Sequence, residues 1–167
     1  MDLLRELFRY HAWAALRLID ACIGYPPAIV HEIVVATDRS ILHILTHLVG
    51  TEQVYLETLT GEAAADTIRR GEVLSLTDLR PRYQVQSRRW DAALERIADL
   101  DVTIPADAAR PAMPHAQNLL FMQMIQHGID HRTQICTTLQ TLGLEAPAID
   151  GWAYWAAAYQ ADSSSKQ

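Results

Sequence analysis

The chain has 167 residues, half of them hydrophobic and 20% charged, with a formal net charge of −6. That length suits one domain that buries a core without disulfide or metal staples. Lysine occurs once and the arginines are scattered, so the clustered positive charge of a nucleic-acid-binding surface is missing. We find neither a membrane-spanning stretch of about 18 apolar residues nor a signal-peptide pattern, and we expect a cytoplasmic protein that binds no membrane.

The first predicted helix covers residues 3–22, where apolar residues recur at the three- and four-residue spacing of a helix that faces a core. His11 lies inside this helix, and we interpret it as a hydrogen-bonded structural residue rather than a ligand. Cys22 and Cys136 have no paired spacing, so we interpret both as buried free thiols. We treat residues 28–36 as a loop or an extended crossover.

The second predicted helix starts after Thr37 and Asp38, its N-cap candidates, and ends at Gly61. Its apolar stripe includes Glu52, so one carboxylate is predicted to point toward the core. Because a buried acid is costly unless it is paired, Glu52 needs a partner there.

The middle of the chain alternates between connections and one helix. Residues 61–75 are rich in small and polar residues and predict the long connection of the domain. A third helix is predicted from residue 77 to residue 97, with Pro81 tolerated in its first turn. Residues 101–115 contain three prolines, too many for a helix, although residues 102–104 suit a short strand.

The fourth helix is predicted over residues 118–142, and a short aromatic helix over residues 152–159. We assign residues 1–162 to a single domain and residues 163–167 to a polar tail. Four long amphipathic helices without a convincing sheet predict an all-α fold. We expect a four-helix bundle with a long crossover connection and a short C-terminal helix.

Two histidines in the fourth helix indicate a metal site. His127 and His131 are four residues apart, about 40° around a helix axis, so both imidazoles point the same way. Neutral imidazole is the commonest metal ligand among side chains, and an open zinc-like site needs at least a third ligand. His43 and His47 both lie on the second helix, and geometry alone does not choose between them. The pair is not the metalloprotease signature, because no Glu follows the first His.

A wider pattern covers almost the whole chain. It comprises Ser40–Ile41, Leu45–Leu48, Glu52 and Tyr55–Leu56, followed by Met124, His127–Ile135 and Leu142–Gly143. Looser matches at Tyr10–Ala14 and Asp150–Tyr154 extend it toward both ends. This pattern resembles the DinB-like, DNA-damage-inducible family of metal-binding bundles, which includes the bacillithiol transferases. The resemblance implies a homodimer with a divalent metal, nickel or zinc, held by His47, His127 and His131. His43 is then a neighbour of the site.

The resemblance also implies a metal-dependent thiol S-transferase or isomerase that acts on small electrophiles with bacillithiol, mycothiol or glutathione. A divalent ion with an open position deprotonates a bound thiol, or brings bound water to a pKa of ~7. Glu52 and Asp130 are candidates for accepting the ligands' remaining N–H groups or for carrying a proton. An equally good interpretation pairs Glu52 with an arginine such as Arg132.

Two other functions stay open. One is a non-enzymatic, metal-binding stress-response dimer, in which His43 or Asp130 completes a closed shell of four protein ligands. The other is a metal-dependent hydrolase, which needs the same open site and a well-placed base.

Overall fold

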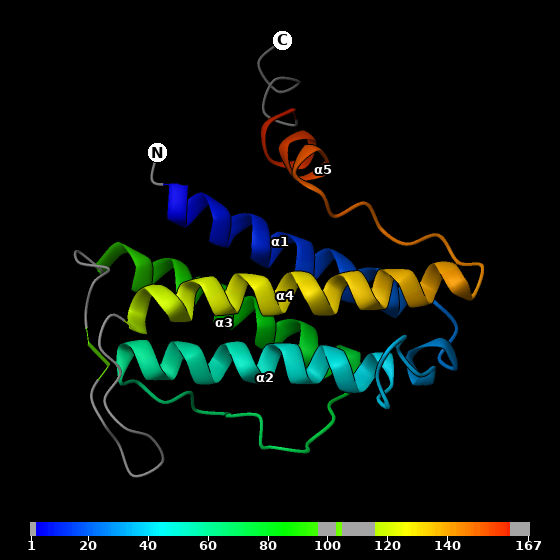
Figure 1. Cartoon of the computed structure of the whole chain (residues 1–167), viewed down its shortest axis with the longest axis horizontal. Coiled ribbons are helices and arrows are strands. Elements are labelled where there is room, and N and C mark those ends of the chain that lie inside the picture. Colours follow the sequence, from blue (N-terminus) through cyan, green and yellow to red (C-terminus); the bar gives the residue numbers. More distant parts are fainter. Residues whose placement is uncertain (1–2, 97–102, 105–115, 161–167) are drawn as a thin grey trace.

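A computed structural model describes residues 3–96, 103–104 and 116–160 of the protein. These residues form four long helices and a short C-terminal one, which confirms the predicted all-α fold (Figure 1). The helices are α1 (Leu3–Gly24), α2 (Ile41–Thr60), α3 (Leu76–Arg96), α4 (Ala116–Thr141) and α5 (Gly151–Trp155). A 3-10 turn (Ile29–His31) precedes α2, and a π-helical turn (Ala156–Gln160) continues α5. None of the described helices is both long and apolar enough to cross a membrane.

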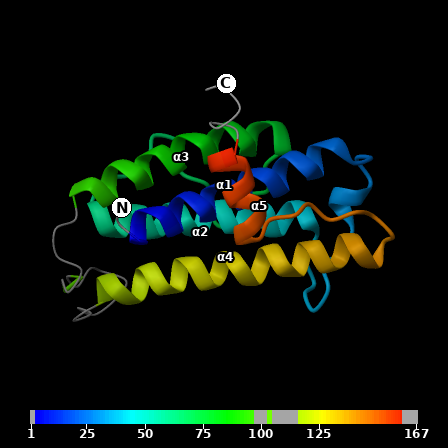
Figure 2. The same cartoon turned by 90° about the horizontal axis from the view of Figure 1, so that it is seen from above.

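The four long helices form a bundle in which each helix has two neighbours. Helix α1 packs against α3 and α4, and α2 packs against the same two helices. Figures 1 and 2 show that α1 and α4 run in one direction, whereas α2 and α3 run in the other. Because α2 and α3 are parallel, the chain between them has to return along the length of the bundle. This return is the long connection that the sequence predicts.

The returning chain, residues 61–75, is fastened to the side of α2, and we call it the crossover. The backbone N–H of Ile68 donates to Oε1 of Gln53 (3.1 Å), and that of Leu74 donates to Oγ1 of Thr46 (3.2 Å). The side chains of Ile68 and Leu74 are buried. The crossover therefore runs antiparallel to α2 and covers one of its faces.

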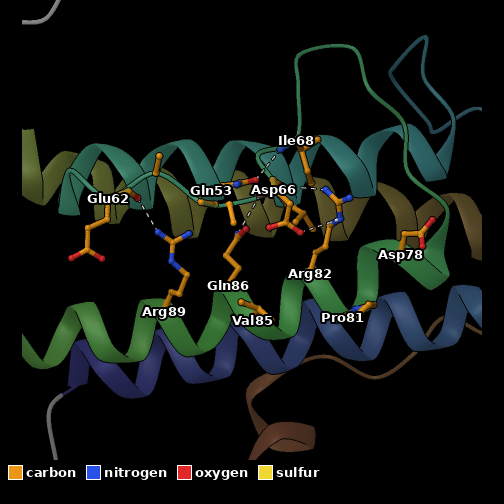
Figure 3. A pocket seen from close by; sticks show the side chains of 14 residues that line it. Gln53, Glu62, Asp66, Ile68, Asp78, Pro81, Arg82, Val85, Gln86 and Arg89 are labelled. Atoms are coloured by element: carbon orange, nitrogen blue, oxygen red, sulfur yellow. Dashed lines mark hydrogen bonds and ion pairs between the residues drawn. The ribbon is translucent and has the colours of Figure 1, made fainter.

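On its other side the crossover contacts α3 around a cleft of about 630 Å³ (Figure 3). Arg82 of α3 lies 3.6 Å from the Asp66 carboxylate, and Arg89 donates to the backbone carbonyl of Glu62 (2.8 Å). The cleft is lined by residues of α2, α3 and the crossover, and no histidine is among them.

Helix α2 begins later than the N-cap prediction placed it. Its N-cap is Ser40, whose hydroxyl accepts a backbone N–H of the first turn. The prediction that Thr37 or Asp38 is the N-cap of this helix is therefore wrong. An isolated antiparallel bridge between Ile33 and Ser40 keeps the chain out of the helix up to that residue. Gly61 ends α2 with a φ of 71°, as the sequence predicts.

Other boundaries shift by a few residues. Helix α3 begins at Leu76, so Pro81 is its sixth residue. Pro81 therefore lies just after the first turn, whereas the sequence analysis predicted it within that turn. The predicted loop at residues 28–36 contains the 3-10 turn. Of the predicted strand at residues 102–104, residues 103 and 104 are described and belong to no named helix or strand. The polar tail lies wholly outside the described residues. Ile104 is described and buried.

Helix α4 meets α1 at Gly128, which is buried. A Cβ at this position would lie 2.1 Å from Cε1 of His11 and 2.8 Å from Nη1 of Arg132. Both neighbours are fully packed, because His11 and Arg132 are at most 2% exposed. The His11 ring therefore lies directly against the α4 backbone, and only glycine leaves room for it.

We predict that Gly128→Ala destabilises the protein by about 2 kcal/mol, because the added methyl group has to displace a packed ring. Urea denaturation followed by circular dichroism measures the change. Gly24→Ala is the matched control, since a Cβ at Gly24 meets no atom within 4 Å. Equal losses of stability in the two variants would contradict the close contact.

Candidate metal centre

Three imidazoles from two helices converge between α2 and α4. Nε2 of His127 lies 3.1 Å from Nε2 of His47 and 3.1 Å from Nε2 of His131. The possible ligand atoms of the three residues all lie within 4.8 Å of one another. Three imidazoles around a tetrahedral zinc ion place their nitrogens about 3.3 Å apart. The three side chains therefore have a spacing that one metal ion can bridge.

The two helices explain why these residues meet. His127 and His131 are one turn apart on α4 and share a face. Helix α2 packs against α4 and supplies His47. His43 lies one turn earlier on α2 but does not belong to the cluster. Within the described parts of the chain, no fourth His, Cys, Asp or Glu joins the three imidazoles.

Neighbouring polar side chains orient two of the rings. Nδ1 of His131 lies 2.9 Å from Oε1 of Gln134. Because an amide oxygen only accepts hydrogen bonds, Nδ1 carries the proton and Nε2 presents its lone pair to the cluster. Oγ1 of Thr51 lies 3.4 Å from Nδ1 of His47 and contacts this ring, but a hydroxyl both donates and accepts, so this contact does not select a tautomer. Nδ1 of His127 is buried and has no hydrogen-bond partner among the described residues.

Sequence reasoning missed Gln134 and Thr51. The available signal was their spacing, since each lies three or four residues after a ligand candidate on the same helix.

The surroundings keep the imidazoles of His127 and His47 uncharged. Burial, together with the neighbouring His131 and His47, lowers the pKa of His127 to about 4. Burial also lowers the pKa of His47, with smaller effects from His131, Arg39 and His43. Both rings are therefore neutral at pH 7, in the form that binds a metal ion without first losing a proton.

Glu52 takes part in a buried chain of hydrogen bonds behind the cluster. Its Oε1 lies 2.7 Å from Nε2 of His11, and Nδ1 of His11 lies 3.1 Å from Nη1 of Arg132. A guanidinium only donates, so Nδ1 of His11 accepts and Nε2–H donates to the carboxylate. Glu52 thus contacts His11 rather than a ligand candidate, and it reaches Arg132 only through that ring. His11 is hydrogen-bonded and buried, as the sequence predicts.

The buried carboxylate also acts on a tyrosine of α3. Burial, together with Glu52, raises the pKa of Tyr83 well above its ordinary value. Tyr83 is therefore a neutral phenol at pH 7.

The other predicted residues lie at the edge of the site. Asp130 is exposed and accepts a hydrogen bond from Nε2 of Gln126 (2.8 Å). Like Glu52, it has no hydrogen bond with any of the three clustered imidazoles. His43 lines a cleft of about 520 Å³ that extends to His47.

The donor set fits a divalent transition metal. The Nε2 atoms of His47 and His131 both face Nε2 of His127, and one proton on Nε2 of His127 can form a linear hydrogen bond with only one of them. Two ring nitrogens facing each other at 3.1 Å repel unless a proton or a cation lies between them. His47, His127 and His131 are therefore the residues that could hold the ion.

We predict that the metal-free protein loses stability as the pH falls from 6.5 to 4, in part through His127. Unfolded His127 takes up a proton in this range, whereas folded His127, with its pKa of about 4, does not. Because the unfolded state then binds more protons, acid favours unfolding. Urea denaturation in EDTA at pH 7 and pH 5 measures the effect, and His127→Gln should reduce the pH dependence. An unchanged slope in this variant would contradict the lowered pKa.

Comparisons with known proteins place the chain in a family. The DinB family model matches residues 1–163 of the chain. Protein DinB from Bacillus subtilis (strain 168) is 22% identical over 159 residues, which cover 89% of this chain and 91% of that protein. A match over nearly the whole length agrees with the family resemblance that the sequence shows. The chain belongs to the DinB family.

Proposed function

We propose that this protein binds one divalent transition-metal ion through His47, His127 and His131 and catalyses the reaction of a small thiol with a small electrophile. The observation that carries the proposal is the convergence of three Nε2 atoms from α2 and α4. Membership of the DinB family supports a metal-binding role. Imidazole suits several first-row ions, and we expect nickel or zinc.

The number of ligands favours catalysis over a purely structural ion. A structural site is normally closed by four protein ligands, whereas a catalytic site keeps one position open. His43 and Asp130, the residues that could close the shell, both lie outside the cluster. An ion in such an open site supplies one chemical effect, stabilisation of the anion of a bound thiol or water.

The positions of the acidic residues favour a thiol over water as the nucleophile. Hydrolysis needs a general base within hydrogen-bonding reach of the attacking water. Glu52 is bound to His11 behind the cluster, and Asp130 is bound to Gln126 at the surface. The protein's own contribution is then to hold the imidazoles neutral and oriented, through burial and through Gln134.

We further propose that the protein is a homodimer. Trp152 is 84% exposed, Trp155 49% and Tyr159 42%, all at the C-terminal end of the described chain. Aromatic side chains of this size are enriched at protein interfaces.

A metal-binding dimer without enzymatic activity is the alternative function.

Metal analysis of purified variants tests the ligand set. We predict one equivalent of metal in the wild-type protein and less than about a tenth of that in His47→Ala, because two imidazoles bind far more weakly than three. His43→Ala is the matched control on the same helix and should retain the full equivalent. Inductively coupled plasma mass spectrometry after dialysis gives these numbers.

Loss of metal in His43→Ala with full retention in His47→Ala would contradict the assignment. A screen of thiols with a generic electrophile then separates the two functions. Thiol-dependent turnover that disappears in His47→Ala supports the transferase, whereas metal binding without turnover supports the non-enzymatic dimer.

The role of Gln134 gives a second test. We predict that Gln134→Leu weakens metal binding by about tenfold, because His131 loses the acceptor that fixes its tautomer and ring orientation. Competition with a chromophoric chelator measures the affinity. Gln126→Leu removes an amide that hydrogen-bonds only Asp130 and should leave the affinity unchanged. Equal affinities in both variants would show that Gln134 does not orient the ligand.

A further inference from the structure

A second cleft adjoins the histidine cluster on the outer side of α2. It has a volume of about 520 Å³ and extends to His47, the ligand candidate that α2 supplies. One wall is the exposed face of α2 and the other is the crossover. Its lining residues from α2 are His43, Thr46, His47, Gly50, Thr51 and Val54. A small molecule bound at the metal site could therefore extend into this cleft.

The walls of this cleft carry positive charge on an otherwise acidic protein. Arg39, Arg69 and Arg70 line it, against a single carboxylate, that of Glu72. Glu72 accepts a hydrogen bond from the backbone N–H of Arg69 (2.9 Å), so its carboxylate contacts the main chain. The whole chain has a net charge of −6, whereas the charged residues that line this cleft are three arginines and one glutamate. The cleft is therefore locally positive.

These arginines also lack the partners that other arginines of the bundle have. The guanidiniums of Arg69 and Arg70 form no ion pair or hydrogen bond with a described residue. Among the described residues, the guanidinium of Arg39 forms an ion pair only with Asp38, at 3.9 Å. The Asp38 side chain is itself almost fully exposed, so solvent screens this pair. In the cleft on the other side of the crossover, by contrast, Arg82 is paired with Asp66 (Figure 3). Guanidinium groups of this kind are available to a carboxylate or phosphate of a ligand.

We propose that this cleft binds the anionic part of the substrate, a carboxylate or phosphate group carried by the small molecule whose other end reaches the three histidines. The inference rests on the proposed metal site and adds the charge of the substrate. It assigns Arg39, Arg69 and Arg70 a role in specificity. An acidic thiol should accordingly bind better than a neutral or basic thiol of the same size.

The test compares three small thiols on the cobalt-loaded protein: 3-mercaptopropionate, 2-mercaptoethanol and cysteamine, which are anionic, neutral and cationic beside the thiol. Cobalt–thiolate absorption at low ionic strength gives each Kd. We expect 3-mercaptopropionate to bind about tenfold more tightly than 2-mercaptoethanol, with cysteamine weakest. Arg70→Gln should reduce the preference about threefold, a typical effect of one partly exposed ion pair.

Arg88→Gln is the matched control, because it also removes one exposed guanidinium of the bundle but lies on α3 outside this cleft. It should leave the preference unchanged. The proposal is overturned if the wild-type protein shows no charge preference, or if the two variants change it equally.

A second measurement separates failure of this proposal from failure of the metal site. The metal-free protein is titrated with propionate and with inorganic phosphate, following the backbone amides of Gly50 and Gly71 by NMR. Saturable shifts that weaken in Arg70→Gln support the anion site even when no cobalt binds, and the tighter anion identifies carboxylate or phosphate as the recognised group. Absence of saturable shifts with both anions overturns the anion site even when cobalt binds.

Discussion

The buried hydrogen bonds from Glu52 through His11 to Arg132 join three helices of the bundle, and the position of the histidine cluster depends on them. Glu52 belongs to α2, His11 to α1 and Arg132 to α4, and all three side chains are at most 2% exposed. A neutral imidazole between a carboxylate and a guanidinium leaves the group uncharged overall. Removing one member would strand a buried charge, at a cost of about 3–5 kcal/mol. The three helices are therefore held in one relative arrangement.

The same stretch of α4 faces both this buried group and the histidine cluster. Gly128 and Arg132 are one turn apart and face His11, whereas His127 and His131 are one turn apart on the adjacent face. Successive residues are about 100° apart around a helix axis, so the two faces have a fixed relation. If α4 rotated its imidazoles away from α2, a residue with a side chain would replace Gly128 against the ring of His11, where a Cβ has no room. The packing of α4 against α1 thus orients the imidazoles of His127 and His131 toward α2.

Much of the fold and part of the site could be predicted from the sequence. Apolar periodicity identified the four long helices, and the spacing of His127 and His131 identified two of the three imidazoles that the structure brings together. The choice of His47 over His43 needed the family resemblance, because it depends on how α2 and α4 pack. Glu52 was recognised as buried, but its partner His11 lies 41 positions away, and no local pattern connects them. The arginine-lined cleft was also missed, since the crossover has no periodicity that fixes its path along α2.

X-ray absorption spectroscopy of the zinc-loaded protein tests the central claim most directly, because it counts the imidazoles bound to the ion. The account predicts three imidazole nitrogens at about 2.0 Å and at least one further oxygen neighbour from solvent. After addition of a thiol, a sulfur neighbour should appear at about 2.3 Å. Four imidazoles, or a first shell without imidazole scattering, would contradict an open site made by His47, His127 and His131.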